Sequence, residues 1–354
     1  MKKDNHKSKI SFLFKIFFYF SCLMTLISLL IAVCLVCQFF LYTYSPSGLH
    51  EPRSVKVLKG ETFYNIAKNF EKDHLIANNY TFTILARFLK IDKKIKSGIY
   101  SLSPAMSPFL ILQKLSSGNI ELTKVVFPEG YTIELMGLAL EQANIVSKND
   151  FVAYAHNPHI ARSLGIQADS LEGYLFPDTY SFSQNSSPEA VVKTLLNRFW
   201  TIFDESFCKR AEEVGFSIHD VVTFASIVEK ETGQANERPI ISSVFHNRLK
   251  RNMRLESDPT VIYGIKNFDG NLTRKHLNTK TPYNTYRIKG LPHGPIANPG
   301  EQSIRAALYP ETSKYLYFVS KQDGTHHFST NLKSHNRAVN LYQRKKRTDQ
   351  SKNG

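Results

Sequence analysis

The sequence predicts an α+β protein that is held to a membrane by one N-terminal helix. Three features lead to this prediction. A long apolar segment begins near the N-terminus, a small region of alternating strand and helix patterns follows it, and the rest of the chain mixes amphipathic helices with short strands. The 354 residues are enough for two domains of ordinary size besides the apolar segment.

The apolar segment Ile16–Tyr44 contains no Asp, Glu, Lys or Arg. It exceeds the roughly 20 residues that cross a bilayer, and it is too long for the apolar part of a cleaved signal peptide. Residues 1–15 are rich in lysine, and the positive-inside rule places such a segment in the cytoplasm. We therefore expect a single-pass anchor at 16–44, with everything after about Ser45 outside the cytoplasm.

Charge and cysteine content narrow the compartment and the partners. The formal net charge is +15, which suits an acidic partner or an anionic surface. No helix-turn-helix, zinc-finger or RNP signature is present, so we predict no nucleic-acid binding. Cys208 is the one cysteine after the anchor, and a large exported region without disulfides is typical of a bacterial envelope. The basic end of the chain, 343–354, reads as a disordered tail.

Residues 53–120 predict a small βααβ module. Strand patterns at Val55–Leu58 and Ile99–Leu102 flank helix patterns at Phe63–Phe70 and Asn78–Leu89, and a further helix is expected at Ser107–Ser116. This pattern, with the phrase Lys-Gly-Glu-Thr at 59–62, resembles a LysM module, which binds glycan chains. The alternative is a spacer that separates the next domain from the membrane.

Residues 121–342 predict a larger α+β domain. A strand at Thr123–Phe127 is followed by helices, including a long amphipathic one within Pro188–Val214, and two strands are expected near the end, at Tyr315–Val319 and His327–Asn331. The aromatic segment Leu171–Tyr180 and the segment Thr281–Gly300, which is rich in proline and glycine, are expected to be turns and loops.

The segment Val221–Gly233 is where acid–base chemistry is expected. Its apolar residues recur every three or four positions, which predicts a helix with Gly233 as its C-cap. Glu229 and Glu231 stand at its C-terminal end and project roughly 200° apart, so they cannot share one site. Glu229 has small neighbours one turn back that leave room for a substrate, whereas Glu231 has bulky ones that suggest a shielded side chain. An ordinary amphipathic helix with a solvated, charged end is the alternative.

Polar and aromatic side chains gather in the loop segments of the same region. Rings stack on apolar sugar faces and amides bond sugar hydroxyls, so this composition favours a sugar polymer as ligand. Half-buried loop anchors are the alternative for each tyrosine, and a turn or cap role is the alternative for the aspartate. The candidate substrate-binding residues are Asp258, Tyr263, Tyr283, Asn284, Tyr286 and Tyr180.

Other chemistries find no support. His326, His327 and His335 lie close in sequence, but adjacent residues of a strand point to opposite faces, and no zinc motif is present. The G-x-S-x-G motif of serine hydrolases is missing, and so is a glycine-rich phosphate loop. We therefore predict no metal site and no cofactor.

Seven segments, in the same order, resemble the MltG/YceG-like endolytic murein transglycosylases over Val55–Tyr342. They are EGYLFPDTY (172–180), ASIVEKET (225–232), VFHNRL (244–249), DPTVIYG (258–264), PYNTY (282–286), GLPHGPIANPG (290–300) and YLYFV (315–319). The resemblance implies a bitopic protein of the bacterial inner membrane with a LysM-like subdomain and a periplasmic YceG-like catalytic domain. It also implies that Glu229 is the essential acid/base. His293 departs from the family, which often has proline there.

The resemblance implies a lyase that cuts the MurNAc–GlcNAc β-1,4 bond of nascent glycan strands, as a terminase of their elongation. One carboxylic acid can protonate the glycosidic oxygen and then take the proton from the sugar's own 6-hydroxyl, which leaves a 1,6-anhydroMurNAc end without using water. The implied partners are peptidoglycan strands and peptidoglycan synthases. A catalytically inactive glycan-binding scaffold is the alternative, and the intact ASIVEKET segment argues against it.

Overall fold

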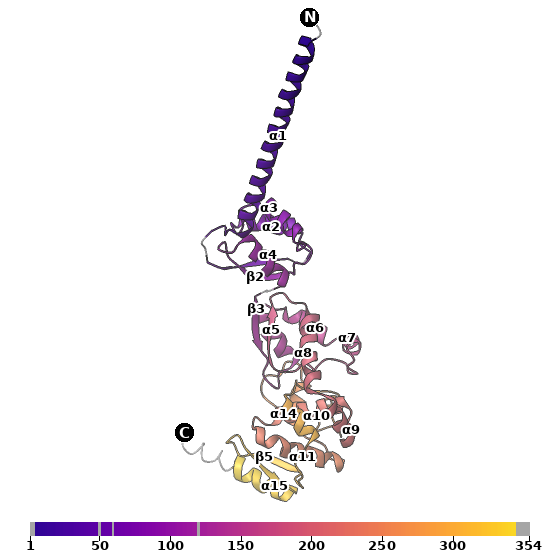
Figure 1. Ribbon diagram of the computed structural model, residues 1–354. Helices are drawn as coiled ribbons and strands as arrows, with labels where there is room; N and C mark the ends of the chain where they lie inside the picture. The colour runs from indigo at the N-terminus through magenta and orange to yellow at the C-terminus, as the bar shows by residue number, and fades with distance from the viewer. Residues whose placement is uncertain (1–3, 49–50, 59, 119–120, 345–354) are drawn as a thin grey trace, which may run out of the picture. The chain divides into compact units, whose positions relative to one another are not determined.

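The computed structural model describes residues 4–48, 51–58, 60–118 and 121–344 (Figure 1). The chain divides into two compact units, Met1–Leu122 and Thr123–Gly354. Most of the predicted basic tail lies outside the described residues, and so does the start of the predicted cytoplasmic segment. The finer division into segments and domains stays a prediction.

Unit 1 begins with one long helix, α1 (Asp4–Tyr44). The most apolar 18-residue window of its part from Phe17 to Tyr44 has a mean hydropathy of 2.7 and is not buried inside the protein. At 1.5 Å per residue these 28 residues extend about 42 Å, which is long enough to cross a bilayer. The last turns of α1 pack on the small module that follows, where Phe39 and Tyr42 contact its core.

The module of unit 1 is a pair of strands covered by three helices. Strands β1 (Arg53–Val57) and β2 (Gly98–Leu102) pair antiparallel. The helices are α2 (Phe63–Lys72), α3 (Asn79–Phe88) and α4 (Pro108–Ser117). Alternate strand residues such as Val55 and Tyr100 point into one apolar core with the inner faces of the helices. The predicted βααβ order is confirmed, whereas the LysM-like character of the module stays a prediction.

Unit 2 is mostly helical and contains two separate pairs of short strands. Its helices are α5 (Ile133–Gln142), α6 (Lys148–Ala155), α7 (Pro158–Ser163), α8 (Pro188–Ile202), α9 (Glu205–Val214), α10 (Ile218–Glu231), α11 (Arg238–Lys250), α12 (Asp258–Tyr263), α13 (Arg274–Asn278), α14 (Glu301–Leu308) and α15 (Leu332–Val339), with short η1 (Ala235–Glu237) and η2 (Asn340–Arg344). The strands are β3 (Leu122–Val126), which begins at the unit boundary and pairs with β4 (Thr179–Ser183), and β5 (Tyr317–Ser320), which pairs with β6 (His326–Ser329).

Helix α10 runs through the core of unit 2. Ser217 and Asp220 form a capping box at its start, and every residue from Val221 to Val228 is buried. Such a helix is held by packing on all sides, here mainly by α11 and α14. It ends at Glu231, where Thr232 turns to an extended conformation with φ −146°. The prediction of Gly233 as the C-cap is therefore wrong, and Glu231 is the last helical residue.

Two other expectations differ from the structure. The helix expected within Pro188–Val214 is two helices, α8 and α9, because the side chain of Asp204 accepts a hydrogen bond from the Phe207 backbone N–H and caps a new helix. The segment expected to be only turns at 171–180 leads into strand β4, which pairs with β3.

Candidate active site

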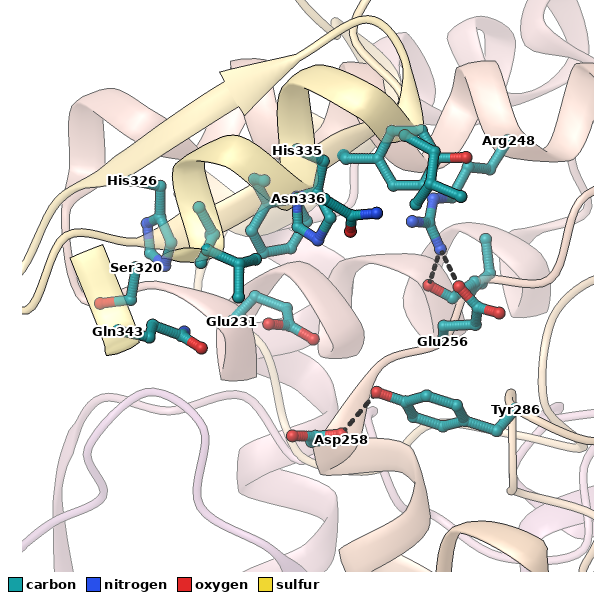
Figure 2. Close-up of a pocket in the computed structure, with 16 residues that line it drawn as sticks. Glu231, Arg248, Glu256, Asp258, Tyr286, Ser320, His326, His335, Asn336 and Gln343 are labelled. Carbon is teal, nitrogen blue, oxygen red and sulfur yellow. Dashed lines mark hydrogen bonds and ion pairs between the residues drawn. The ribbon is translucent and has the colours of Figure 1, made fainter. Parts of the chain in front are cut away.

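Glu231 lies in a polar pocket of about 480 Å³. Figure 2 shows the pocket between the end of α10 and the C-terminal elements β5, β6 and α15. Its carboxyl-bearing side chains are Glu231, Glu256 and Asp258, and its basic or imidazole side chains are Arg248, His326 and His335. A concave site with several convergent polar groups is the expected form of a ligand site.

The surroundings of Glu231 favour its protonated form. Burial raises the pKa of its carboxyl group to about 7, and the charge of Asp258 acts in the same direction. The hydroxyl of Ser257 donates a hydrogen bond to Glu231, and this bond, with the more distant charge of Arg248, partly opposes the rise in pKa. A carboxyl group with this pKa can both give and accept a proton near neutral pH.

Asp258 and Tyr286 form the side of the pocket that faces Glu231 (Figure 2). The Tyr286 hydroxyl donates a hydrogen bond of 2.7 Å to the Asp258 carboxylate. The neighbours of these two residues are joined as well, because the Ser257 backbone N–H donates to the Thr285 hydroxyl at 3.0 Å. Asp258 and Tyr286 thus lie together as predicted for substrate-binding residues, while their contact with a substrate stays a prediction.

Arg248 fixes the chain that leads into Asp258. Its guanidinium donates to the backbone oxygens of Leu255 and Leu316 at 2.9 and 2.7 Å, and it pairs with Glu256 at 3.1 Å. Glu256 has a positive φ of 53°, a conformation that costs energy in a residue other than glycine and that often occurs at functional sites. Arg248 therefore holds both a strained residue and the pocket wall beside Tyr317, whose ring lies 5.0 Å from the guanidinium.

His326 is held in the pocket by a second carboxylate. Its ring Nδ1 lies 2.6 Å from Glu237 Oε2, and its backbone N–H donates to Glu237 Oε1 at 2.9 Å. Both side chains are nearly buried, with exposed fractions of 12% and 11%. Because Nδ1 is engaged by Glu237, Nε2 is the ring nitrogen that can meet a ligand. The neighbouring His327 instead contacts the ring of Tyr342, so adjacent strand residues point apart as expected.

Glu229 lies in a different and closed environment. Its side chain is 5% exposed and pairs with Arg238 at 3.2 Å, whose own side chain is 9% exposed. The other carboxylate oxygen accepts the backbone N–H of Gly300 at 2.9 Å. The side chain is absent from the pocket that contains Glu231. Such a charge is stabilised in place by a buried cation and a backbone donor.

Two glycines lie close to the neighbouring side chains of Glu129 and Glu229. A Cβ atom on Gly300 would come within 1.9 Å of the Glu129 carboxylate, and one on Gly130 would contact the side chain of Glu229 at 3.5 Å. Segments distant in the sequence thus contact Glu229, whereas Glu231 lines the pocket. The predicted role of Glu229 as acid/base, with easier access for a substrate, stays a prediction.

Two predicted substrate-binding residues, Asn284 and Tyr180, are buried and donate hydrogen bonds to backbone oxygens. Asn284 is fully buried, and its amide donates to the backbone oxygens of His276, Leu277 and Thr279. Tyr180 is 8% exposed and donates to the Phe176 backbone oxygen at 2.7 Å. Both side chains therefore support loops of the protein, and their contact with a substrate stays a prediction.

Tyr263 and Tyr283 lie outside the Glu231 pocket. Tyr263 donates to the buried carboxyl group of Glu172 at 3.1 Å, and burial raises the pKa of Glu172 to about 8. Tyr283 packs edge-on against Tyr263 and lines a separate pocket with His219 and His293. The structure therefore does not bring these two predicted residues together with Asp258 and Tyr286.

Sequence reasoning missed the residues that complete the pocket. Ser257 directly precedes Asp258, and Arg248 lies in the VFHNRL segment, but neither position carries a local signal for a pocket residue. Glu237 and His326 are 89 positions apart, so no local pattern joins them. The spacing of the histidines near the end raises only the question of a metal site and gives no sign of a carboxylate–imidazole pair.

Comparison with known proteins agrees with the likeness of the motifs. The model of the YceG-like family matches residues 55–341. An endolytic murein transglycosylase of Bacillus subtilis is 31% identical over 305 residues, which are 82% of this chain and 84% of that protein. An endolytic murein transglycosylase of Streptococcus pneumoniae is 27% identical over 321 residues, which are 81% of this chain and 57% of that longer protein. A solved YceG-like protein from Listeria monocytogenes matches with a TM-score of 0.57 and 32% identity, over 82% of this chain and all of that one. The chain is thus a member of the YceG-like family.

Proposed function

We propose that this protein is a peptidoglycan lytic transglycosylase in which Glu231 carries the proton. Relatives named endolytic murein transglycosylases support the reaction class. The observation that carries the residue assignment is the position of Glu231 in a polar pocket, with a pKa raised to about 7. A general acid works best when its pKa is close to the operating pH.

The reaction balances with one carboxyl group and no water. Protonated Glu231 gives its proton to the oxygen of the MurNAc–GlcNAc β-1,4 bond, and the bond between C1 and that oxygen breaks. The resulting carboxylate then takes the proton from the 6-hydroxyl of the same MurNAc while O6 bonds to C1. The products are a strand that ends in 1,6-anhydroMurNAc and one that begins with a free 4-hydroxyl, and Glu231 is protonated again.

Other pocket residues serve binding in this proposal. The Tyr286–Asp258 pair offers a carboxylate and a hydroxyl to sugar hydroxyl groups, and His326 offers Nε2 to a polar substituent. Glu229 is the competing assignment for the acid/base, because the motif resemblance pointed to it. Its ion pair with Arg238 and its enclosure argue against direct contact with a glycan.

We also propose a location and a cellular role for the protein. We infer that α1 anchors the protein in a bacterial inner membrane with the N-terminus in the cytoplasm, because lysines precede its apolar part. The module at 53–120 is proposed to bind glycan as a LysM-like domain. A role as terminase beside peptidoglycan synthases fits an anchored enzyme that acts on strands as they leave the membrane.

The proposal is tested against the inactive-scaffold alternative with the purified full-length protein in detergent. It is incubated with uncrosslinked peptidoglycan strands, and the strand-length distribution is measured by chromatography. An enzyme shortens the strands progressively with time and enzyme concentration. Binding of the strands without any shortening, under conditions where the protein is folded, would support the scaffold and contradict the proposal.

A further inference from the structure

Helix α3 is apolar on two opposite faces. Phe82, Leu85 and other inner residues are buried in the core of the module. On the outer side, Tyr80, Ile84 and Phe88 are exposed by 65%, 58% and 77%. Residues four apart lie above one another on a helix, so these three form one continuous stripe. We call Tyr80, Ile84 and Phe88 the α3 stripe.

The α3 stripe forms a larger continuous apolar surface than single, scattered surface residues would form. The ring of Tyr64, which is 44% exposed on α2, lies 6.4 Å from that of Tyr80 and extends the apolar surface. Single exposed apolar residues are ordinary, but a contiguous group of large ones marks an interaction surface. The packing of unit 1 covers none of the three stripe residues, so another partner is needed.

The stripe begins next to the end of the membrane-spanning helix. The Tyr42 hydroxyl on the last turn of α1 donates at 2.8 Å to the backbone oxygen of Asn78, which caps the start of α3. Figure 1 shows α3 at the end of the module from which α1 extends. The apolar part of α1 extends about 42 Å, close to the full bilayer thickness of about 40–45 Å with headgroups. The start of α3 therefore lies at headgroup level.

The chain around the end of α3 is basic. Between positions 87 and 96 there are five basic side chains and one acidic one. The five are Arg87, Lys90, Lys93, Lys94 and Lys96, all of them exposed. Within the part of the chain that the structure describes, no ion pair involves any of the five. Basic side chains beside an apolar helix face are what an anionic lipid surface attracts.

We propose that the α3 stripe lies in the headgroup layer of an anionic membrane and holds the module flat against the surface. This gives the module two attachments, the spanning helix α1 and the interfacial helix α3, which together prevent rotation of the module about α1. The inference rests on the proposed membrane anchor, and it is independent of the catalytic assignment.

The test uses the full-length protein in lipid nanodiscs with tryptophan as a depth probe. Trp200 is the only tryptophan, so Trp200→Phe gives a silent background for Phe88→Trp. Lys56→Trp is the matched control, because Lys56 is exposed on β1 and lies outside the α3 stripe. Leu30→Trp, within the apolar part of α1, reports the anchor itself. Quenching is measured with lipids brominated along the acyl chains, with and without phosphatidylglycerol.

In discs that contain phosphatidylglycerol, the brominated lipids should quench the tryptophan fluorescence of Phe88→Trp at least about twofold more than that of Lys56→Trp. Replacing phosphatidylglycerol with phosphatidylcholine should reduce this difference. Equal quenching at positions 88 and 56, with Leu30→Trp strongly quenched, would refute the stripe as a lipid contact but leave the anchor intact. It would instead favour a glycan or protein partner for the stripe. An unquenched Leu30→Trp would overturn the anchor and this inference together.

Discussion

Two carboxylates at the end of α10 stand two positions apart in surroundings of opposite kind. Glu229 has a buried arginine and a backbone N–H as partners, which stabilise its charge. Glu231 has a hydroxyl donor, a neighbouring carboxylate and a pocket that is open to a ligand, and its pKa is raised to about 7. One group is tied into the protein by an ion pair and a backbone hydrogen bond, whereas the other lines a pocket and can exchange a proton.

The difference between the two surroundings arises from the geometry of the helix. Side chains two positions apart project about 200° from each other, so one packs toward Arg238 and Gly300 while the other enters the pocket. The closed site fixes the end of α10 to the segments at 238 and 300. In the proposed mechanism, that attachment positions Glu231.

The largest expected effect is the loss of activity in Glu231→Gln. The amide preserves shape and volume but cannot donate and retrieve a proton, so turnover should fall about 10²–10⁴-fold. Initial rates of strand cleavage by purified protein are the measurement. Glu229→Gln is the matched control, and its folded fraction should keep activity within about tenfold. The reverse ranking of the two variants would return the acid/base role to Glu229.

The stability of the two variants should rank in the opposite order. Glu229→Gln leaves the buried Arg238 with only the half-exposed Glu129 as a charged partner, so we expect a loss of about 1–3 kcal/mol in the free energy of unfolding. Glu231→Gln replaces a group that is readily protonated and should cost less. Thermal unfolding followed by circular dichroism checks this, and equal midpoints for both variants would remove the structural role of Glu229.

The pH dependence sharpens the assignment further. Glu231 is protonated below its pKa of about 7 and charged above it, so kcat/KM should fall on the alkaline side, by about tenfold per pH unit. Asp258→Asn removes a charge that raises this pKa and should move the alkaline limb to lower pH. Ser257→Ala removes a hydrogen bond that lowers the pKa and should move it to higher pH. If both variants shift the kcat/KM profile in the same direction, or if neither shifts it, the alkaline limb does not report the titration of Glu231.

The smallest effect is expected at the Glu237–His326 pair. Glu237→Gln weakens the partner that orients the ring, so substrate binding should suffer more than chemistry, with KM raised about tenfold or less and kcat nearly unchanged. Steady-state kinetics on glycan strands separates the two. A large fall in kcat at constant KM would show that His326 acts in the chemical step and is not only a binding group.

The sequence predicts the elements of this site better than their surroundings. Helical periodicity places α10 and sets its two carboxylates on different faces, and the order of strands and helices in unit 1 is readable in the same way. Which carboxylate is accessible depends on Gly300, 71 positions further along. Local neighbours such as Ala225 cannot indicate a contact made by a distant loop.

Tyrosine and asparagine in a loop were equally ambiguous. Asn284 and Tyr286 belong to the same PYNTY segment, yet the first uses its amide to bind three backbone carbonyls and the second lines the pocket. Residue type alone predicts that both side chains can bind a sugar. Only the direction in which the folded loop presents each side chain distinguishes them.

One carboxyl group, Glu231, is proposed to perform both proton transfers, although Asp258 lies in the same pocket and hydrolases usually use a pair of carboxylates. The direct test is cleavage of glycan strands by the full-length protein in water enriched in oxygen-18, followed by mass spectrometry of the new ends. We expect 1,6-anhydroMurNAc ends that carry no oxygen-18. Reducing ends that carry the label would show that water attacks C1 and would contradict it.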